Sequence, residues 1–167
     1  DAAWVTDAHY PLMVRLDPGS GEIEGPFELN HAGVREGGKD RSIRDLAVGP
    51  DAVWCLQAGG LVRHSPESGA QTRFPVEGNE MAVGPDAIFV ADRIWSPRGE
   101  IVSATGTVIR RLDDSAGEIT EFELPGRLLA RMALGDGALW AATYPPGEAS
   151  GMTLSRIDPG SGTIEGE

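Results

Sequence analysis

Histidine is the side chain best suited to proton transfer near neutral pH, and this chain has three of them. His9 and His31 lie in polar, irregular segments, whereas His64 lies in an apolar run. A general base is normally oriented by a partner such as a carboxylate, and neither His9 nor His31 has one at a regular spacing. The pattern therefore favours solvated histidines at 9 and 31, which could still share one site, and a structural His64.

Acidic side chains offer a second chemistry, the binding of a hard cation. Asp45 and Glu80 occupy equivalent positions in two repeated segments, and Arg131 occupies the same position in a third. Carboxylates at these positions could hold Mg²⁺ or Ca²⁺ through oxygen ligands. The basic residue equally allows an ion pair of Arg131 with Glu80 or Asp45. The sequence indicates no other cofactor.

Trp95 is the one tryptophan outside the repeated pattern, and Arg93 and Arg98 flank it. This combination would suit an acidic or aromatic group of a ligand. The alternative is that Trp95 covers the end of its own loop, because an exposed tryptophan is costly without a partner. Cys55 has no second cysteine or histidine beside it, so we expect a small buried residue rather than a nucleophile.

The composition excludes several kinds of partner. The chain has 167 residues with 14 basic and 26 acidic side chains, a formal net charge of −12. This excess of acid disfavours the phosphate contacts that dominate nucleic-acid affinity, so nucleic acid and anionic membranes are not expected as partners. The longest apolar runs have five or six residues, far short of the roughly 20 needed to span a bilayer. A single cysteine rules out an intrachain disulfide.

The elements that would position these residues form an internal repeat. Four aligned segments with an aromatic fourth residue are Asp1–Val5, Asp51–Cys55, Asp86–Val90 and Gly137–Ala141. Each is followed by a segment that begins with arginine, namely Arg15–Ile23, Arg63–Gln71, Arg111–Ile119 and Arg156–Ile164. A third motif precedes the last three aromatic segments, at Leu46–Pro50, Met81–Pro85 and Met132–Asp136.

Each motif is a short run of β-forming residues bounded by turn formers such as Gly-Pro-Asp and Asp-Pro-Gly-Ser-Gly. One unit thus has four strands, which in the second unit are Leu46–Val48, Val53–Leu56, Leu61–His64 and Gln71–Val76. An all-β unit of about 40 to 45 residues with four antiparallel strands is typical of a β-propeller blade. A sandwich is the alternative, but its apolar residues would alternate more cleanly. The aligned aromatic residues are expected to pack between blades.

The strings Gly117–Pro125 and Ala82–Val90 resemble repeats of virginiamycin B (streptogramin) lyase-like propellers, and are similar to the broader NHL and strictosidine-synthase-like superfamily. The resemblance implies that the Leu-Ala-Val-Gly type of strand is innermost and that the strand ending in Thr-Glu-Phe is outermost. It also implies catalysis by histidines near a magnesium ion. The histidine of the family's Pro-His-Gly-Ile pattern falls on Arg44, Asn79 and Ala130 here, so no catalytic residue is carried over.

This strand order predicts about four blades of four antiparallel strands, of which the first lacks its inner strand. Their approximate bounds are 1–29, 41–76, 78–124 and 127–167. A propeller needs closure because an open inner edge leaves backbone groups unpaired. We expect the chain to belong to a larger ring of six or seven blades, to close its ring by oligomerisation, or to form a four-bladed ring.

The long insertions between strands all fall on one predicted face, at Thr6–Leu12, Asn30–Arg41, Asp92–Thr107 and Thr143–Met152. Long loops on a rigid scaffold commonly carry function. The ligand-binding face is therefore expected to include His9, Tyr10, His31, Arg44, Arg93, Trp95, Arg98 and Tyr144.

These features favour a non-catalytic propeller segment that binds a small molecule or a protein on a face built from loops. It would serve as a sensor or interaction domain of a larger exported or membrane-anchored bacterial protein. The second hypothesis is a lyase-like enzyme acting on a cyclic or ester-containing small molecule, with His9, His31, Glu80 and a divalent cation as candidates. A purely structural scaffold is the third.

Overall fold

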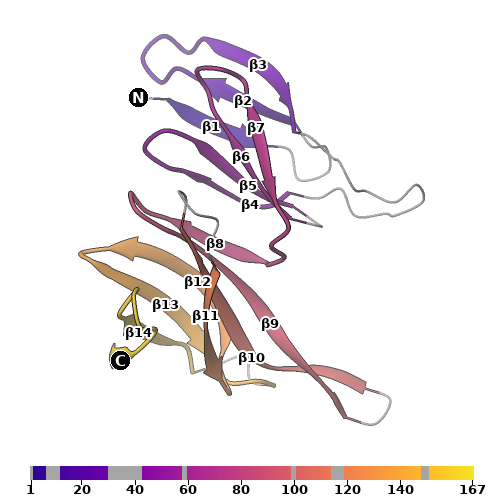
Figure 1. Cartoon of the computed structure of the whole chain (residues 1–167), viewed down its shortest axis with the longest axis vertical. Helices are drawn as coiled ribbons and strands as arrows, with labels where there is room; N and C mark the ends of the chain where they lie inside the picture. Colours follow the sequence, from indigo (N-terminus) through magenta and orange to yellow (C-terminus); the bar gives the residue numbers. More distant parts are fainter. Residues whose placement is uncertain are drawn as a thin grey trace. The chain divides into compact units, whose positions relative to one another are not determined.

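The computed structural model describes residues 2–6, 12–29, 43–57, 60–98, 101–113, 119–147 and 151–167. In this part of the chain all regular structure is β-strand, arranged in four antiparallel sheets (Figure 1). The all-β prediction is confirmed. The described ranges contain no helix long and apolar enough to cross a membrane. The chain divides into two compact units, Asp1–Glu77 and Gly78–Glu167, which we call unit 1 and unit 2.

Unit 1 holds a three-stranded sheet and a four-stranded sheet in which neighbouring strands also follow one another in the sequence. The strands of the first sheet are β1 (Ala3–Thr6), β2 (Leu12–Leu16) and β3 (Ile23–Glu28). Those of the second are β4 (Ile43–Val48), β5 (Val53–Gln57), β6 (Gly60–His64) and β7 (Gln71–Phe74).

Unit 2 holds two four-stranded sheets with the same sequential order. The strands of the first are β8 (Glu80–Val83), β9 (Ile88–Arg98), β10 (Ile101–Leu112) and β11 (Ile119–Pro125). Those of the second are β12 (Leu128–Gly135), β13 (Ala138–Tyr144), β14 (Thr153–Ile157) and β15 (Ile164–Gly166). In every four-stranded sheet the strand carrying the Leu-Ala-Val-Gly type of motif lies at one edge, because it pairs only with the strand that follows it.

Continuous apolar runs form the cores of both units, as the sequence predicts. All five residues of β5 are buried. In unit 2, Phe89 and Ile109 pack with Leu139 and Ile157 into a cluster that joins the two sheets. Cys55 is fully buried in the core of unit 1. Burial raises the pKa of its thiol to about 12, so the thiol is protonated and the prediction of a small buried residue is confirmed.

The repeated aromatic residues are not equally buried, which corrects the expectation that all four are core. Trp54 and Phe89 are buried, whereas Trp4 and Trp140 are half-buried. Trp4 packs against Phe27, with ring centroids 5.6 Å apart. A face of a blade is fully covered only where a second sheet packs on it, and the repeat alone does not specify where that happens.

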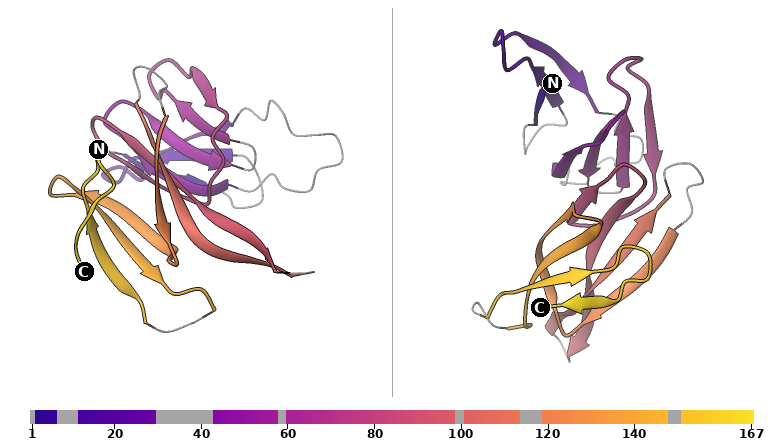
Figure 2. Two further views of the ribbon diagram at one scale, coloured as in Figure 1. Left: turned by 60° about the horizontal axis from the view of Figure 1, so that its bottom comes forward. Right: turned by 90° about the vertical axis from the view of Figure 1, so that its left-hand side faces the viewer.

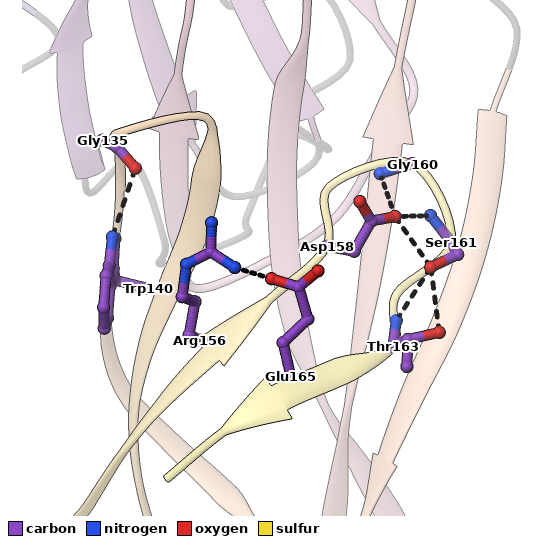
Figure 3. Close-up of polar contacts among 8 residues, drawn as sticks. All are labelled: Gly135, Trp140, Arg156, Asp158, Gly160, Ser161, Thr163 and Glu165. Carbon is purple, nitrogen blue, oxygen red and sulfur yellow. Dashed lines mark hydrogen bonds and ion pairs between the residues drawn. The ribbon is translucent and has the colours of Figure 1, made fainter.

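The Asp-Pro-Gly-Ser-Gly segments form tight turns, as predicted. In the turn before β15, Oδ1 of Asp158 accepts hydrogen bonds from the backbone N–H of Ser161 at 2.6 Å and of Gly160 at 3.2 Å (Figure 3). Gly162 closes the turn with a φ of 73°, a conformation that glycine adopts without strain. Asp17 makes the same contacts in the first sheet. Hydrogen bonds from Ser161 and Ser20, respectively, hold the pKa values of these two carboxyl groups below their usual range.

The segment Asp92–Thr107, which the sequence suggested to be a long loop, is instead a two-stranded ribbon. Strands β9 and β10 pair as far as Arg98 and Ile101, and Figure 2 shows this ribbon running beyond the rest of its sheet. The register shifts between Ala104 and Gly106, which marks a β-bulge. The ribbon forms because β-branched residues continue through positions 101–109, so the strand does not end where the repeat ends.

Candidate functional site

A polar hollow of about 450 Å³ opens at one end of the two sheets of unit 2. It is lined by residues at the starts of β8 and β12, in the interior of β9 and at the end of β13. This is the face on which the sequence placed the long insertions. We call it the loop-face hollow; its polar lining residues are Asn79, Glu80, Asp92, Arg93, Thr107, Arg131 and Tyr144.

An ion pair joins the two sheets across the loop-face hollow. Nη1 of Arg131 on β12 contacts Oε1 of Glu80 on β8, which is one of the pairs that the sequence allowed. The Glu80 side chain is 17% exposed and that of Arg131 is 78% exposed. Because the guanidinium group is largely in water, the pair contributes little to stability.

The second carboxylate of the hollow is held within its own sheet. Nδ2 of Asn79 donates to Oδ1 of Asp92 at 2.5 Å, and the backbone N–H of Arg93 donates to the same oxygen at 2.8 Å. Both acidic side chains of the loop-face hollow therefore already have donors.

Arg93 and Tyr144 occupy the same position in two successive repeats, four residues after the aromatic residue of each. Arg93 is exposed and Tyr144 is half-buried. Among the described residues, neither side chain has a hydrogen bond or an ion pair. The hollow thus presents a guanidinium group and a phenol that are available to a ligand.

Thr107 fastens the two sheets together beneath the loop-face hollow. Its Oγ1 donates to the backbone oxygen of Arg127 at 2.9 Å and accepts from the backbone N–H of Leu129, also at 2.9 Å. The side chain is buried. Because one hydroxyl group serves two backbone groups of the neighbouring sheet, Thr107 fixes the distance between the walls of the hollow.

The described lining offers charged and aromatic side chains to a ligand. It contains no histidine or cysteine, and its one aliphatic hydroxyl group, on Thr107, is already engaged. A group that carries negative charge would meet Arg93 and the exposed side of Arg131. An aromatic group would find Tyr144.

The structure places the other predicted site residues as follows. Arg44 and Asp45 lie on β4 in unit 1, where Asp45 accepts a hydrogen bond from the backbone N–H of Leu46 at 2.9 Å. Trp95 and Arg98 belong to β9, and their side chains lie outside the described part of the chain. His9, Tyr10 and His31 also lie outside it.

Asp45 belongs to unit 1 and Glu80 to unit 2, and Glu80 is paired with Arg131. A metal site that uses these two carboxylates stays a prediction. Within the described ranges, no group of three or more histidine, cysteine or acidic side chains is placed to hold one ion.

Several residues of the site were missed by sequence reasoning, although a signal for some was present. Asp92 matches Gln57 and Thr143 in the repeat, so a polar residue stands three positions after the repeated aromatic residue in three successive copies. That regularity could have pointed to this position. The role of Thr107 had no signal, because its partners come from a neighbouring sheet.

A second hollow, of about 570 Å³, lies at the opposite end of unit 2 among the tight turns. We call it the turn-face groove; Phe89, Leu134, Pro85, Pro159 and Arg111 are among the residues that line it. A smaller hollow of about 260 Å³ in unit 1 has Trp4, Arg15 and Pro66 at matching positions. The turn-face groove of unit 2 thus has a smaller counterpart at the same repeat positions in unit 1.

Taken together, sequential antiparallel sheets, packed in pairs with insertions at one end, define a β-propeller type of chain. Comparison with solved structures agrees. The Pan2 WD40 domain of Neurospora crassa matches 98% of this chain with a TM-score of 0.63 at 16% identity. The N-terminal domain of Nup159 also matches 98%, with a TM-score of 0.55 at 12% identity. The predicted fold class is thus confirmed.

A third similar structure is the extracellular domain of a B. thetaiotaomicron protein described as a hybrid two-component system, with a TM-score of 0.52 at 15% identity over 98% of this chain. The chain spans 45%, 44% and 21% of these three structures, respectively, so it corresponds to less than half of each. No family model matches the sequence, and a search of curated proteins finds no similar sequence. The likeness concerns the fold alone.

Proposed function

We propose that this chain is a non-catalytic propeller segment that binds a protein partner at the loop-face hollow. The preferred ligand is a protein segment with acidic and aromatic side chains. One observation carries the proposal: Arg93 and Tyr144, at equivalent repeat positions, line one hollow and have no partner among the described residues.

The size and charge of the hollow support this choice of ligand. A volume of about 450 Å³ falls within the roughly 300–1,000 Å³ that is usual for ligand pockets. Glu80 is paired with Arg131, and Asp92 keeps its negative charge although it accepts hydrogen bonds from the Asn79 amide and a backbone N–H. The hollow therefore has no excess of either sign, and the group offered to an acidic partner is the exposed guanidinium of Arg93. Arginine and tyrosine are also the residues that most often dominate the energy of binding interfaces.

The lyase-like alternative has less support. The repeats resemble those of virginiamycin B lyase-like propellers, but that resemblance concerns scaffold motifs. At the positions where it would place histidine, the loop-face hollow has Asn79 and Ala130. We therefore propose binding without catalysis, as part of a larger protein with sensor or interaction functions.

A peptide selection tests the proposal. Peptides are selected from a random library on the full chain, and their dissociation constants are measured by fluorescence anisotropy against four proteins: the unmodified chain, Arg93→Ala, Tyr144→Ala and Arg111→Ala. Arg111 lines the turn-face groove at the opposite end of unit 2 and serves as the matched control for loss of an arginine.

We expect the selected peptides to be rich in acidic and aromatic residues. Arg93→Ala and Tyr144→Ala should each weaken binding by about tenfold, which corresponds to about 1.4 kcal/mol, and Arg111→Ala should leave it unchanged. Added salt should reduce the loss of affinity caused by Arg93→Ala, because the Arg93 contact is exposed and is screened by ions. Peptides that lose affinity only for Arg111→Ala would place the binding face at the other end of the unit and refute the proposal.

A further inference from the structure

Arg111 belongs to a set of four repeated arginines, and it is the member without an ion pair in the described part of the chain. The matching arginines of the other three sheets each pair with an acidic side chain, and Figure 3 shows the last of these pairs: Arg15 with Glu24, Arg63 with Asp51, and Arg156 with Glu165. Arg111 is half-buried, and its guanidinium group has neither a hydrogen bond nor an ion pair among the described residues. A guanidinium group that is partly removed from water without a partner favours an anionic ligand.

One difference within the repeat leaves Arg111 without a cross-strand partner. The residue opposite Arg15 on the neighbouring strand is Glu24, whereas the residue opposite Arg111 is Thr120. Threonine fits the strand but carries no charge. Arg111 therefore lacks the carboxylate that pairs with Arg15 at 2.8 Å.

Asp86 is a carboxylate without a partner at the same end of this sheet. It matches Asp51, which pairs with Arg63 at 2.7 Å. That pair shows that the backbone spacing of the repeat allows side chains at these two positions to touch. In unit 2, Asp86 and Arg111 both line the turn-face groove. They do not pair with each other, and Asp86 has no other hydrogen bond or ion pair within the described ranges. A positive and a negative group are thus both open to a ligand.

The rest of the turn-face groove is mainly apolar. Pro85, Leu134 and Pro159 are among the residues that line it, and its third charged residue is Asp136. The groove therefore offers two carboxylates and one guanidinium group. An anion would leave both carboxylates without a partner, and a cation would leave the guanidinium group without one. A ligand that carries both charges is complementary to the whole groove.

The turn-face groove is larger than its counterpart in unit 1, at about 570 Å³ against about 260 Å³. Two lining positions have a smaller residue in unit 2. Phe89 stands where unit 1 has Trp4, and Gly160 stands where unit 1 has Glu67. The sequence of unit 2 thus widens the hollow in the same place where it leaves an arginine unpaired.

Hydrogen bonds and turn geometry fix the walls of the turn-face groove. Asp136 and Gly137 form the two-residue turn between β12 and β13 with φ values of 50° and 70°, as in a type I′ turn. The backbone N–H of Gly84 donates to the oxygen of Ala87 at 2.9 Å, and Asp158 caps the turn that carries Pro159. Because the walls are formed in advance, little ordering is needed when a ligand binds.

We propose that the turn-face groove binds a free α-amino acid with a large apolar side chain. The carboxylate of the ligand pairs with Arg111, its ammonium group pairs with Asp86, and its side chain contacts Leu134 and Pro159. The two charges of the ligand must lie only a few bonds apart, because the side chains that match Arg111 and Asp86 in unit 1 are in direct contact. An α-amino acid meets this condition.

NMR titration of the full chain with L-phenylalanine and two analogues tests the proposal. N-acetyl-L-phenylalanine lacks the ammonium group, as a peptide C-terminus does, and L-phenylalaninamide lacks the carboxylate, as a peptide N-terminus does. L-phenylalanine should perturb the amide resonances of Asp86, Ala87, Asp136 and Gly137. Each analogue should bind at least about tenfold more weakly, because it leaves one charged group of the groove without a partner.

Variants at Thr120 show whether Arg111 is the anchor. Thr120→Glu supplies the missing cross-strand carboxylate, so it should weaken binding of L-phenylalanine by at least about tenfold, as Arg111→Ala should. Thr120→Gln is the matched control: it has the same size without the charge and should leave binding unchanged.

Three results would overturn the proposal. One is the absence of perturbations around Asp86 and Asp136 at millimolar L-phenylalanine. Another is equal binding of either analogue, since the ligand would then be a peptide terminus. The last is equal binding to Thr120→Glu and Thr120→Gln. None of them bears on the loop-face hollow, which shares no lining residue with the turn-face groove, so this proposal and the proposed function fail separately.

Discussion

Replacement of Thr107 by valine tests whether one hydroxyl group holds the two sheets of unit 2 together. Valine has nearly the same shape as threonine but cannot serve the backbone N–H of Leu129 or the backbone oxygen of Arg127, each 2.9 Å from Oγ1. Leaving a buried polar group without a partner costs about 1–3 kcal/mol. The hydrogen bond from the backbone N–H of Leu129 is buried, whereas the one to the backbone oxygen of Arg127 is only partly buried. Loss of the second bond should therefore cost less than loss of the first. We therefore expect a loss of about 2–3 kcal/mol in the free energy of unfolding.

Thr107→Ser is the matched control, because serine keeps the hydroxyl group and removes one methyl group. Its expected cost is roughly 1 kcal/mol. Both variants are measured by urea denaturation followed by tryptophan fluorescence, with the slope m compared to exclude a change in the unfolded state. If Thr107→Val is no less stable than Thr107→Ser, the hydroxyl group does not hold the sheets and the assignment is wrong.

Three further changes have defined outcomes. Gly162→Ala should lower the free energy of unfolding, measured by urea denaturation, by about 2 kcal/mol more than Gly126→Ala does. Both glycines have a positive φ, but only at Gly162 would an added Cβ clash with the Phe122 side chain. Equal effects would contradict packing of this turn on β11. Thr120→Glu should give Arg111 a cross-strand ion-pair partner, as Glu24 does for Arg15 at 2.8 Å. The free energy of unfolding should rise by up to about 1 kcal/mol at low salt and by little at high salt. A gain that does not depend on salt would argue against an ion pair. His64, buried beside Trp4 and Phe27 with neither ring nitrogen hydrogen-bonded in the described part, has a pKa lowered by burial from its ordinary 6.5. The unfolded state therefore gains a proton first as pH falls, so stability should be constant above about pH 6.5 and drop by up to about 1.4 kcal/mol per pH unit below it. His64→Leu should abolish this difference between pH 5 and 8, and a pH dependence unchanged by the substitution would contradict it.

The architecture could be predicted because turns and apolar runs recur at fixed positions. The Asp-Pro-Gly-Ser-Gly turn is local: Asp158 caps its own backbone, so its sequence is sufficient to define it. The extended β9–β10 ribbon was not predicted, because its length depends on pairing between two strands rather than on the repeat. Burial of the repeated aromatic residues also depends on neighbouring sheets, which is why Trp54 and Trp140 differ.

The candidate site was predictable only in part for the same reason. Arg93 and Tyr144 could be assigned to one face from strand direction alone, since ends of second strands meet at one end of a blade. Which side chains remain available there depends on contacts between sheets. The pairing of Glu80 with Arg131 joins residues 51 positions apart, and sequence reasoning could offer it only as one option among several.

The loop-face binding site is tested most directly by NMR titration of the full chain with a selected acidic and aromatic peptide. Perturbed amide resonances should concentrate at the starts of β8 and β12, at Asp92 and Arg93, and at the end of β13, and they should vanish in Arg93→Ala combined with Tyr144→Ala. Perturbations confined to the turns around Pro85 and Pro159 would place binding at the turn-face groove and contradict the proposed function.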